Sequence, residues 1–454
     1  MTNKKHTNIL ILLFVGVLMG ALDISIVGPA IPSIEKTMHV EEHDLSWIFS
    51  IYVLFNLIGI SFMAKMSDVY GRRWIYVIAV AIFGLGSLVV SASHEITWLL
   101  IGRGIQGFGS SGIFPVAIAV IGDIFPIEKR GRALGLIGAV FGIAFILGPF
   151  IAGIMLLYFD WNALFLINIP VAFLIMIFAA RLLPVNQPEK KPPVDWAGII
   201  MMGVILTSFT LALNNIDTHN VVESLGSWPV LPYLMLTILL TPLLIMLETH
   251  QHEPILNVKL FNSMQVRLVG FIAFGVGLFQ SSVVFLPKLA VNLFRVGPSK
   301  ASFMLLPVVI ATALGSPVSG RLVDKIGSRL IILTSLLVAS VALFLLSMLS
   351  QDQILFYTAE SCLGIGLAMR ASLNYIMLNE VPEHERASTQ GVLIIFVSVG
   401  QLTGAALVGA ISSATPGQTA GYGIAFLVMT VLSAALVVLA FFLKNRKQEL
   451  MGIN

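Results

Sequence analysis

Charged residues are scarce in this sequence. Asp, Glu, Lys and Arg together make up 11% of the 454 residues, whereas soluble domains carry about 25%. Hydrophobic residues reach 57%, and the mean hydropathy is +0.96. This composition excludes an ordinary soluble domain, so we expect a protein that crosses a membrane several times.

Cysteine is nearly absent as well. Cys362 is the only one and lies in an apolar run, which excludes an internal disulfide and a metal site built from several cysteines. The net charge of +3 is mild, so no nucleic-acid partner is expected. We find no set of nucleophile and base and no metal-ligand set, so we expect neither an enzyme nor a cofactor.

Long apolar runs fill the sequence instead. A helix of about 20 apolar residues spans a bilayer, and the first run, behind Lys4 and Lys5, is too long for a cleaved signal peptide. We expect fourteen spans, near 9–31, 46–64, 75–93, 97–121, 133–157, 163–183, 196–214, 229–247, 266–290, 299–319, 330–349, 354–378, 389–412 and 421–443.

Basic residues fall mainly on one side of these spans. Of the 26 Lys and Arg, 20 lie on the side of the N-terminus, four on the other side and two inside spans. Cytoplasmic loops carry an excess of basic residues. We therefore predict a multi-pass protein of the inner or plasma membrane with both termini in the cytoplasm.

The sequence repeats itself at an offset of 256 residues. "SDVYGRR" at 67–73 matches "VDKIGSR" at 323–329, and the fourth spans of the two halves match at an offset of 257. The offset of 256 pairs Asp68 with Asp324, Gly71 with Gly327, Arg73 with Arg329, Gly148 with Gly404 and Gly153 with Gly409; the offset of 257 pairs Gly107 with Gly364.

The repeat defines the expected architecture. Residues 1–185 form one six-helix bundle, 186–262 a linker with two inserted spans, and 263–454 a second six-helix bundle with a cytoplasmic tail. An even number of inserted helices keeps both halves in the same orientation, as a parallel repeat requires. The predicted fold is therefore an all-α membrane protein of fourteen helices, an arrangement typical of secondary transporters.

Five motifs at the expected span ends carry a family resemblance. They are "ALDISIVGPAIP" (21–32), "AKMSDVYGRR" (64–73), "RGIQGFGSSG" (103–112), "GLIGAVFGIAFILGPFIAG" (135–153) and "DWNALFLINIP" (160–170). In this order they resemble the fourteen-span drug:proton antiporter branch of the major facilitator superfamily. Ala64, Val69, Ala144, Ala152 and Asn162 depart from the usual residues of these motifs.

The resemblance implies roles for two groups of residues. The loop motif implies a cytoplasmic gating element in each half, formed by Asp68, Gly71, Arg72 and Arg73, and by Asp324, Gly327 and Arg329. The motif of the fifth span marks exporters and includes Gly148, Pro149 and Gly153. Small residues there also allow close helix packing, and the packing role and the exporter role are compatible.

Ionisable residues inside spans are the remaining candidates, because a charge at mid-membrane costs roughly 2.5–3.5 kcal/mol on insertion scales. Asp23 and Arg103 lie on small-residue faces, and Gln106 shares the Arg103 face. Glu360 stands where Arg103 stands in the repeat. For Arg370 the sequence does not decide between lining the pathway and helix packing, and we expect Lys288, near a span end, to snorkel to the interface.

We predict an exporter of small hydrophobic, cationic compounds that exchanges them for protons as a monomer, with no other cofactor. Asp23 is the first candidate for proton coupling, ahead of Arg103 and Glu360; a purely structural role of Asp23 as a hydrogen-bonding group between helices is the alternative. A lipid or lipid-precursor exporter is the nearest alternative function. A passive channel, an importer and an intramembrane enzyme fit the motifs less well.

Overall fold

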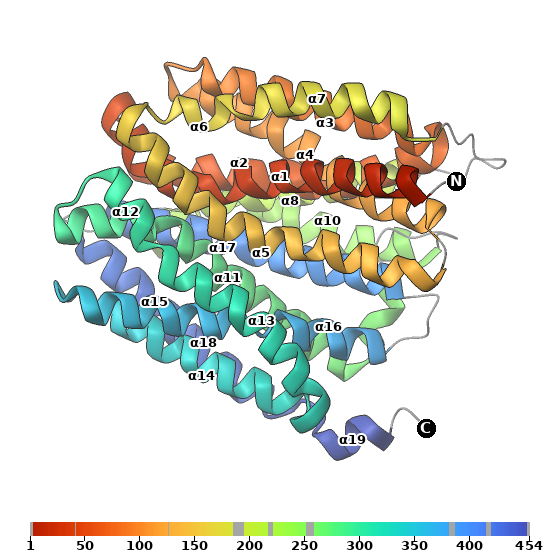
Figure 1. Ribbon diagram of the computed structural model, residues 1–454. Coiled ribbons are helices and arrows are strands. Elements are labelled where there is room, and N and C mark those ends of the chain that lie inside the picture. Colours follow the sequence, from red (N-terminus) through yellow and green to blue (C-terminus); the bar gives the residue numbers. More distant parts are fainter. Residues whose placement is uncertain are drawn as a thin grey trace. The chain divides into compact units, whose positions relative to one another are not determined.

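The computed structural model describes residues 3–40, 42–125, 127–184, 195–216, 221–250, 258–380, 386–414 and 419–451. All regular elements in these ranges are helical (Figure 1). Fourteen helical segments in them are long and apolar enough to cross a membrane. This confirms the predicted all-α membrane fold and its number of spans.

The chain divides into two compact units, unit 1 with residues 1–40 and 47–199, and unit 2 with residues 41–46 and 200–454. The predicted division into three parts rests on the sequence repeat and stays a prediction. Unit 1 contains α1 (Asn3–Met38), α3 (Arg72–Ser91), α4 (Ile96–Ile124), α5 (Ile127–Tyr158), α6 (Asn162–Leu166) and α7 (Asn168–Leu182). It also contains α2 (Glu42–Tyr70) except for its first residues, and the first residues of α8 (Trp196–Asn214).

Unit 2 contains most of α8 and the helices that follow it. These are α9 (Val221–Leu225), α10 (Leu231–His250), the 3-10 helix η1 (Val258–Asn262), α11 (Met264–Phe294), α12 (Pro298–Met304), α13 (Leu306–Ile326), α14 (Ser328–Ser347), α15 (Gln353–Leu367), α16 (Arg370–Asn379), α17 (Arg386–Ala414), α18 (Ala420–Ala440) and α19 (Arg446–Met451).

Equivalent helices pack in the same pairs in both units. In unit 1, α3 packs against α4 and α7, and α1 packs against α5; in unit 2, α14 packs against α15 and α18, and α11 against α17. A Cβ on Gly107 would lie 2.3 Å from the carbonyl oxygen of Tyr52, and one on Gly364 would lie 2.2 Å from that of Val308. Because Tyr52 and Val308 are themselves 256 residues apart, these close contacts extend the sequence repeat into the packing.

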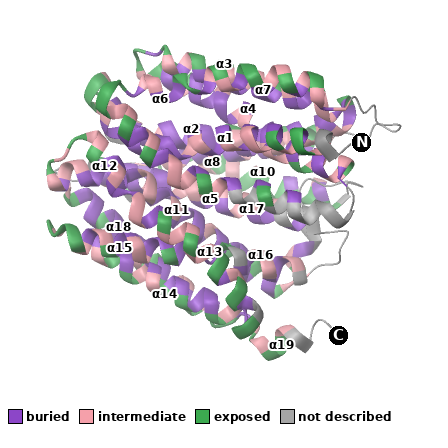
Figure 2. Ribbon diagram, viewed as in Figure 1, coloured by how far each residue is buried: buried purple, intermediate pink, exposed green. Residues whose placement is uncertain are grey.

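Burial differs strongly among the spans. In the apolar stretch of α11, 72% of the residues are buried, and the share is 61% in α1 and in α4. In α10 only 11% of the residues of this stretch are buried (Figure 2). Helices that are apolar all round suit a bilayer, because lipid solvates their exposed side chains. The polar groups of α1 and α4 are therefore held in the interior of unit 1, where they need partners.

Candidate functional site

Asp23 lies in the interior of unit 1 and is 0% exposed. Its Oδ2 accepts a hydrogen bond from Arg103 Nη1 on α4 at 2.5 Å. Its Oδ1 accepts one from Gln106 Nε2 at 3.0 Å and one from Asn168 Nδ2 of α7 at 2.9 Å. Both carboxylate oxygens are thus bonded, as a buried charge requires.

Arg103 is held from several sides. Its side chain is 0% exposed, Nε donates to the carbonyl oxygen of Ile48 at 3.2 Å, and Nη1 also donates to Gln106 Oε1 at 2.8 Å. The guanidinium lies 4.2 Å from the centre of the Tyr52 ring, a cation–π arrangement. Nη2 has no hydrogen-bond partner among the described residues, so the pair leaves one donor unused.

The structure therefore joins three predicted residues, Asp23, Arg103 and Gln106, into one buried network. Gln106 extends it by donating to Ser87 Oγ of α3 at 2.7 Å. Sequence reasoning missed Asn168. A signal existed, since it is a polar residue inside an apolar run of the quoted motif at 160–170, but an uncharged amide in a span is not unusual enough to single out.

A buried Asp–Arg pair is a chemical switch. The ionised carboxylate attracts the guanidinium. Protonation neutralises the carboxylate and so removes that attraction. Breaking such a pair from one side costs about 3–5 kcal/mol, because the other charge is left unpaired. A proton bound to Asp23 would therefore weaken the attraction between α1 and α4.

The exporter motif packs against α1, the helix that carries Asp23. A Cβ on Gly148 of α5 would lie 2.0 Å from Ser25 Oγ, and Ser25 is two residues from Asp23 on α1. Ser25 Oγ donates to the carbonyl oxygen of Ala144 at 3.0 Å. Pro149 lies inside α5 without ending it, and Gly153 follows one turn later. The predicted close packing in this motif is confirmed at Gly148.

The first predicted gating loop forms a cluster at the end of α2. Asp68 pairs with Arg72, and Arg72 Nε also reaches Asp123 Oδ2 of α4 at 3.2 Å. Gly71 has φ +93°, a conformation that side chains disfavour. Arg73 Nε donates to the carbonyl oxygen of Leu183 at 2.5 Å. Asp123 is a further member that the sequence did not single out.

The second loop repeats the turn of the first. Gly327 has φ +89° and is the N-cap of α14, while Arg329 lies 5.8 Å from the ring centre of Phe441. The side chain of Asp324 lies outside the described residues. Glu449 of α19 accepts hydrogen bonds from the backbone N–H and the hydroxyl of Ser328. The C-terminal helix thus supplies the cap that Gly327 lacks.

The other candidates lie in unit 2 and do not belong to the Asp23 network. Glu360 is 0% exposed, and neither oxygen has a hydrogen-bond partner among the described residues. Arg370, at the start of α16, is exposed, and the choice between pathway lining and helix packing stays open. Lys288 is 1% exposed, so the expected snorkelling is wrong: α11 is an interior helix, and the ammonium group stays within the bundle.

Comparison with known proteins identifies the family of the chain. The family model described as Major Facilitator Superfamily matches residues 13–309 and 268–451. YfiU of Bacillus subtilis (strain 168), named an uncharacterised transporter of this type, is 31% identical over 88% of this chain and 79% of its own. The multidrug transporter MdtP of the same organism is 29% identical over 91% of this chain and 77% of its own.

Further comparisons show the fold and the range of named relatives. A crystal structure of the nucleoside transporter NupG has a TM-score of 0.70 at 12% identity and covers 96% of this chain and 99% of its own. A protein named triacylglyceride transporter from Mycolicibacterium smegmatis (strain ATCC 700084 / mc(2)155) is 28% identical over 87% of this chain and 73% of its own.

Proposed function

The chain belongs to the major facilitator superfamily and is a multi-pass membrane transporter, not an enzyme, and from this premise we propose that it exports small hydrophobic, cationic compounds in exchange for protons. The observation that carries the proposal is the buried pair of Asp23 and Arg103. A carboxylate fully removed from solvent and bonded on both oxygens is a site where the loss or gain of one proton has structural consequences.

Coupling follows from competition for the carboxylate. When Asp23 is ionised, its charge attracts Arg103 or a substrate cation; when it is protonated, it attracts neither strongly. A proton taken up on one side therefore favours release of a cationic substrate, and loss of the proton favours rebinding. Arg103 keeps Asp23 from standing as an isolated charge when no substrate is bound.

The contact between Gly148 and Ser25 supports a route from this chemistry to helix motion. Because α5 lies so close to α1, a shift of α1 that follows loss of the ion pair cannot occur without a shift of α5. Alternating access of a two-bundle transporter requires such coordinated movement. In this proposal the cluster of Asp68, Arg72 and Asp123 holds the cytoplasmic ends of α2, α3 and α4 together.

The orientation and the setting are part of the proposal. The excess of basic residues on the side of the N-terminus favours cytoplasmic termini in an inner or plasma membrane. In that orientation substrates are taken from the cytoplasm or the inner leaflet. We take the working unit to be a monomer that uses protons and needs no other cofactor.

Lipid export is the second candidate, and the relative named as a triacylglyceride transporter favours it. The relative MdtP, named as a multidrug transporter, favours the first. A lipid substrate has no need of a cation site, so the effect of Asp23 on a neutral lipid and on a cationic dye separates the two.

Transport by purified protein in liposomes tests the proposal. Protein is reconstituted in vesicles, a pH gradient is imposed, and accumulation of the cationic dye ethidium is compared with transfer of a fluorescent diacylglycerol. We expect dye accumulation that follows the gradient, collapses with a protonophore and is lost in Asp23→Asn. Dye movement that only equilibrates would indicate a channel, and transfer of lipid but not dye would overturn the proposal in favour of lipid export.

A further inference from the structure

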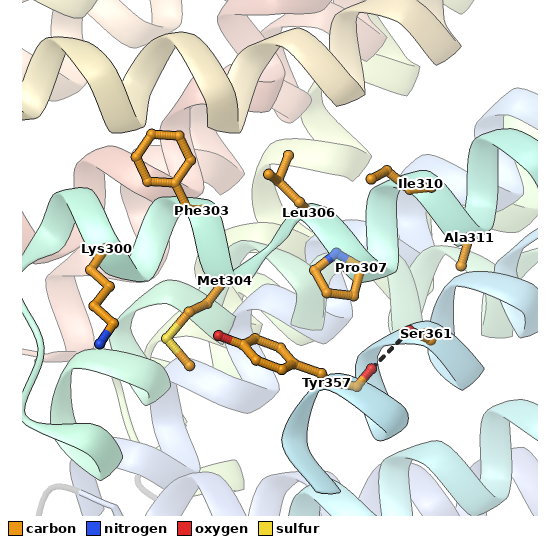
Figure 3. A pocket seen from close by; sticks show the side chains of 9 residues that line it. All are labelled: Lys300, Phe303, Met304, Leu306, Pro307, Ile310, Ala311, Tyr357 and Ser361. Atoms are coloured by element: carbon orange, nitrogen blue, oxygen red, sulfur yellow. Dashed lines mark hydrogen bonds between the residues drawn. The ribbon is translucent and has the colours of Figure 1, made fainter. Parts of the chain in front are cut away.

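One span of unit 2 is interrupted, and a cavity opens beside the interruption. The helical segment Pro298–Val323 breaks at Leu305, between α12 and α13. Pro307, the second residue of α13, has no N–H to continue the helical hydrogen-bond ladder. The cavity has a volume of about 590 Å³ and lies between this span and α15 (Figure 3).

The lining of this cavity is mainly apolar and partly aromatic. Phe303 and Met304 come from α12 and Pro307 from α13, while Tyr357 and Ser361 come from α15. Figure 3 shows the Tyr357 ring between Met304 and Pro307. Small-molecule sites typically have volumes of about 300–1,000 Å³ and combine apolar walls with a few polar groups. The cavity matches both criteria.

The available polar groups of the lining are hydrogen-bond donors. Lys300 is exposed and forms no ion pair within the described part of the chain, and the Tyr357 hydroxyl has no hydrogen-bond partner there. Ser361 is already committed, because its hydroxyl donates to the carbonyl oxygen of Tyr357 at 2.8 Å. In Figure 3 the Lys300 ammonium and the Tyr357 hydroxyl lie on either side of the Met304 side chain.

No carboxylate balances Lys300 on the lining. Glu360 is the neighbouring acid on α15, but it is 0% exposed and does not line the cavity. Neither Glu360 oxygen has a hydrogen-bond partner among the described residues, so this carboxyl group does not pair with Lys300. The lining therefore presents one positive charge, one hydroxyl that is not yet hydrogen-bonded in the described residues, and apolar surfaces.

We propose that this cavity binds aromatic organic anions, with the ring system of the ligand against Tyr357, Met304 and Pro307 and its anionic group on Lys300. The Tyr357 hydroxyl donates a second hydrogen bond to the same anionic group. An ammonium group recognises a carboxylate or sulfonate as a point charge. The protein would then bind anions at this cavity in addition to the cations expected at Asp23. That these anions are transported substrates rests on the proposed function.

Equilibrium binding to purified protein tests the site without requiring transport. Fluorescein, an aromatic anion, and rhodamine 6G, a cation on the same xanthene ring system, are titrated in a neutral maltoside detergent and followed by fluorescence anisotropy. We expect wild-type protein to bind fluorescein, Lys300→Gln to weaken binding about tenfold or more, as loss of a charged hydrogen bond predicts, and Tyr357→Phe to weaken it several-fold.

Two variants sharpen the test. Lys36→Gln removes an exposed lysine in the last turn of α1, outside the cavity, and is expected to leave fluorescein binding unchanged. Lys300→Glu reverses the charge and is expected to shift preference from fluorescein to rhodamine 6G. Thermal unfolding of each variant checks that it is folded.

Three results would overturn the proposal. The first is fluorescein affinity that is equal in wild type and Lys300→Gln. The second is tighter binding of rhodamine 6G that is lost in Glu360→Gln, which would make the cavity a cation site. The third is a copurified anionic phospholipid that is lost in Lys300→Gln while fluorescein never binds. Because no proton gradient is involved, each result is distinct from failure of proton-coupled export.

Discussion

Replacing Arg103 by glutamine is expected to destabilise unit 1 by about 3–5 kcal/mol, the cost of leaving one member of a buried ion pair without its partner. The substitution removes the contact of 2.5 Å to Asp23 and leaves that carboxylate with only Gln106 and Asn168 as donors. Asp23→Asn leaves a buried guanidinium without a countercharge and carries a cost of the same order.

The double variant with Asp23→Asn and Arg103→Gln separates the pair from its surroundings. Neither charge remains, so its loss of stability is expected to fall short of the sum of the single losses by about 2–3 kcal/mol. Unfolding in mixed detergent is followed by tryptophan fluorescence, for which Trp161, 2% exposed in unit 1, is a suitable reporter.

Arg72→Gln is the matched control for this cycle. It breaks the ion pairs of Arg72 with Asp68 and Asp123, but the two carboxylate side chains are 40% and 38% exposed, and an exposed pair contributes less than about 1 kcal/mol. Two results would refute the idea that Asp23 and Arg103 act as one buried ionic unit. The first is a loss of stability in Asp23→Asn and in Arg103→Gln that is no larger than the loss in Arg72→Gln. The second is a double variant whose loss of stability equals the sum of the two single losses.

Three further predictions concern the exporter motif, the first gating loop and the topology. Gly148→Ala should lower the stability of the protein by about 1–3 kcal/mol, because its Cβ would lie 2.0 Å from Ser25 Oγ. Gly142→Ala in the same helix has no atom within 4 Å of the new Cβ and should leave stability unchanged or raised. Equal melting temperatures of the two variants would contradict this. Asp68→Asn should slow exchange while substrate affinity is kept, and a variant that lost affinity but kept its exchange rate would oppose the gating role. A tag placed within residues 216–226 should be accessible only from outside the cell, and labelling from the cytoplasm would show that the span count or the orientation is wrong.

The architecture could be predicted from the sequence because each membrane helix is recognisable from its own residues. Each span must be apolar along its length, so fourteen runs could be counted, and the internal repeat, with an offset of 257 residues in the fourth spans, predicted the equivalence that the packing repeats at Gly107 and Gly364. The ends of the helices could be predicted less well. α1 continues to Met38, seven residues beyond the apolar run, because a helical backbone does not stop where hydrophobic side chains stop.

The site was predictable in its members but not in its contacts. Asp23 and Arg103 stood out because charges in spans are costly, yet nothing local indicates that two residues 80 positions apart form a pair. Asp123 and Glu449 were missed because carboxylates near helix ends are ordinary. The break at Leu305 was also missed, since Pro149 and Pro287 lie inside unbroken helices and a proline alone does not predict a break.

Proton release on substrate binding tests the coupling role of Asp23 most directly. Purified protein in weakly buffered detergent solution is mixed with the cation tetraphenylphosphonium, and the pH of the medium is recorded with an indicator dye. The account predicts that wild-type protein, at a starting pH low enough for Asp23 to be protonated, releases protons as the cation binds, whereas Asp23→Asn binds the cation more weakly and releases none. Equal proton release from wild type and Asp23→Asn, or substrate binding by wild type with no release at any starting pH, would contradict it.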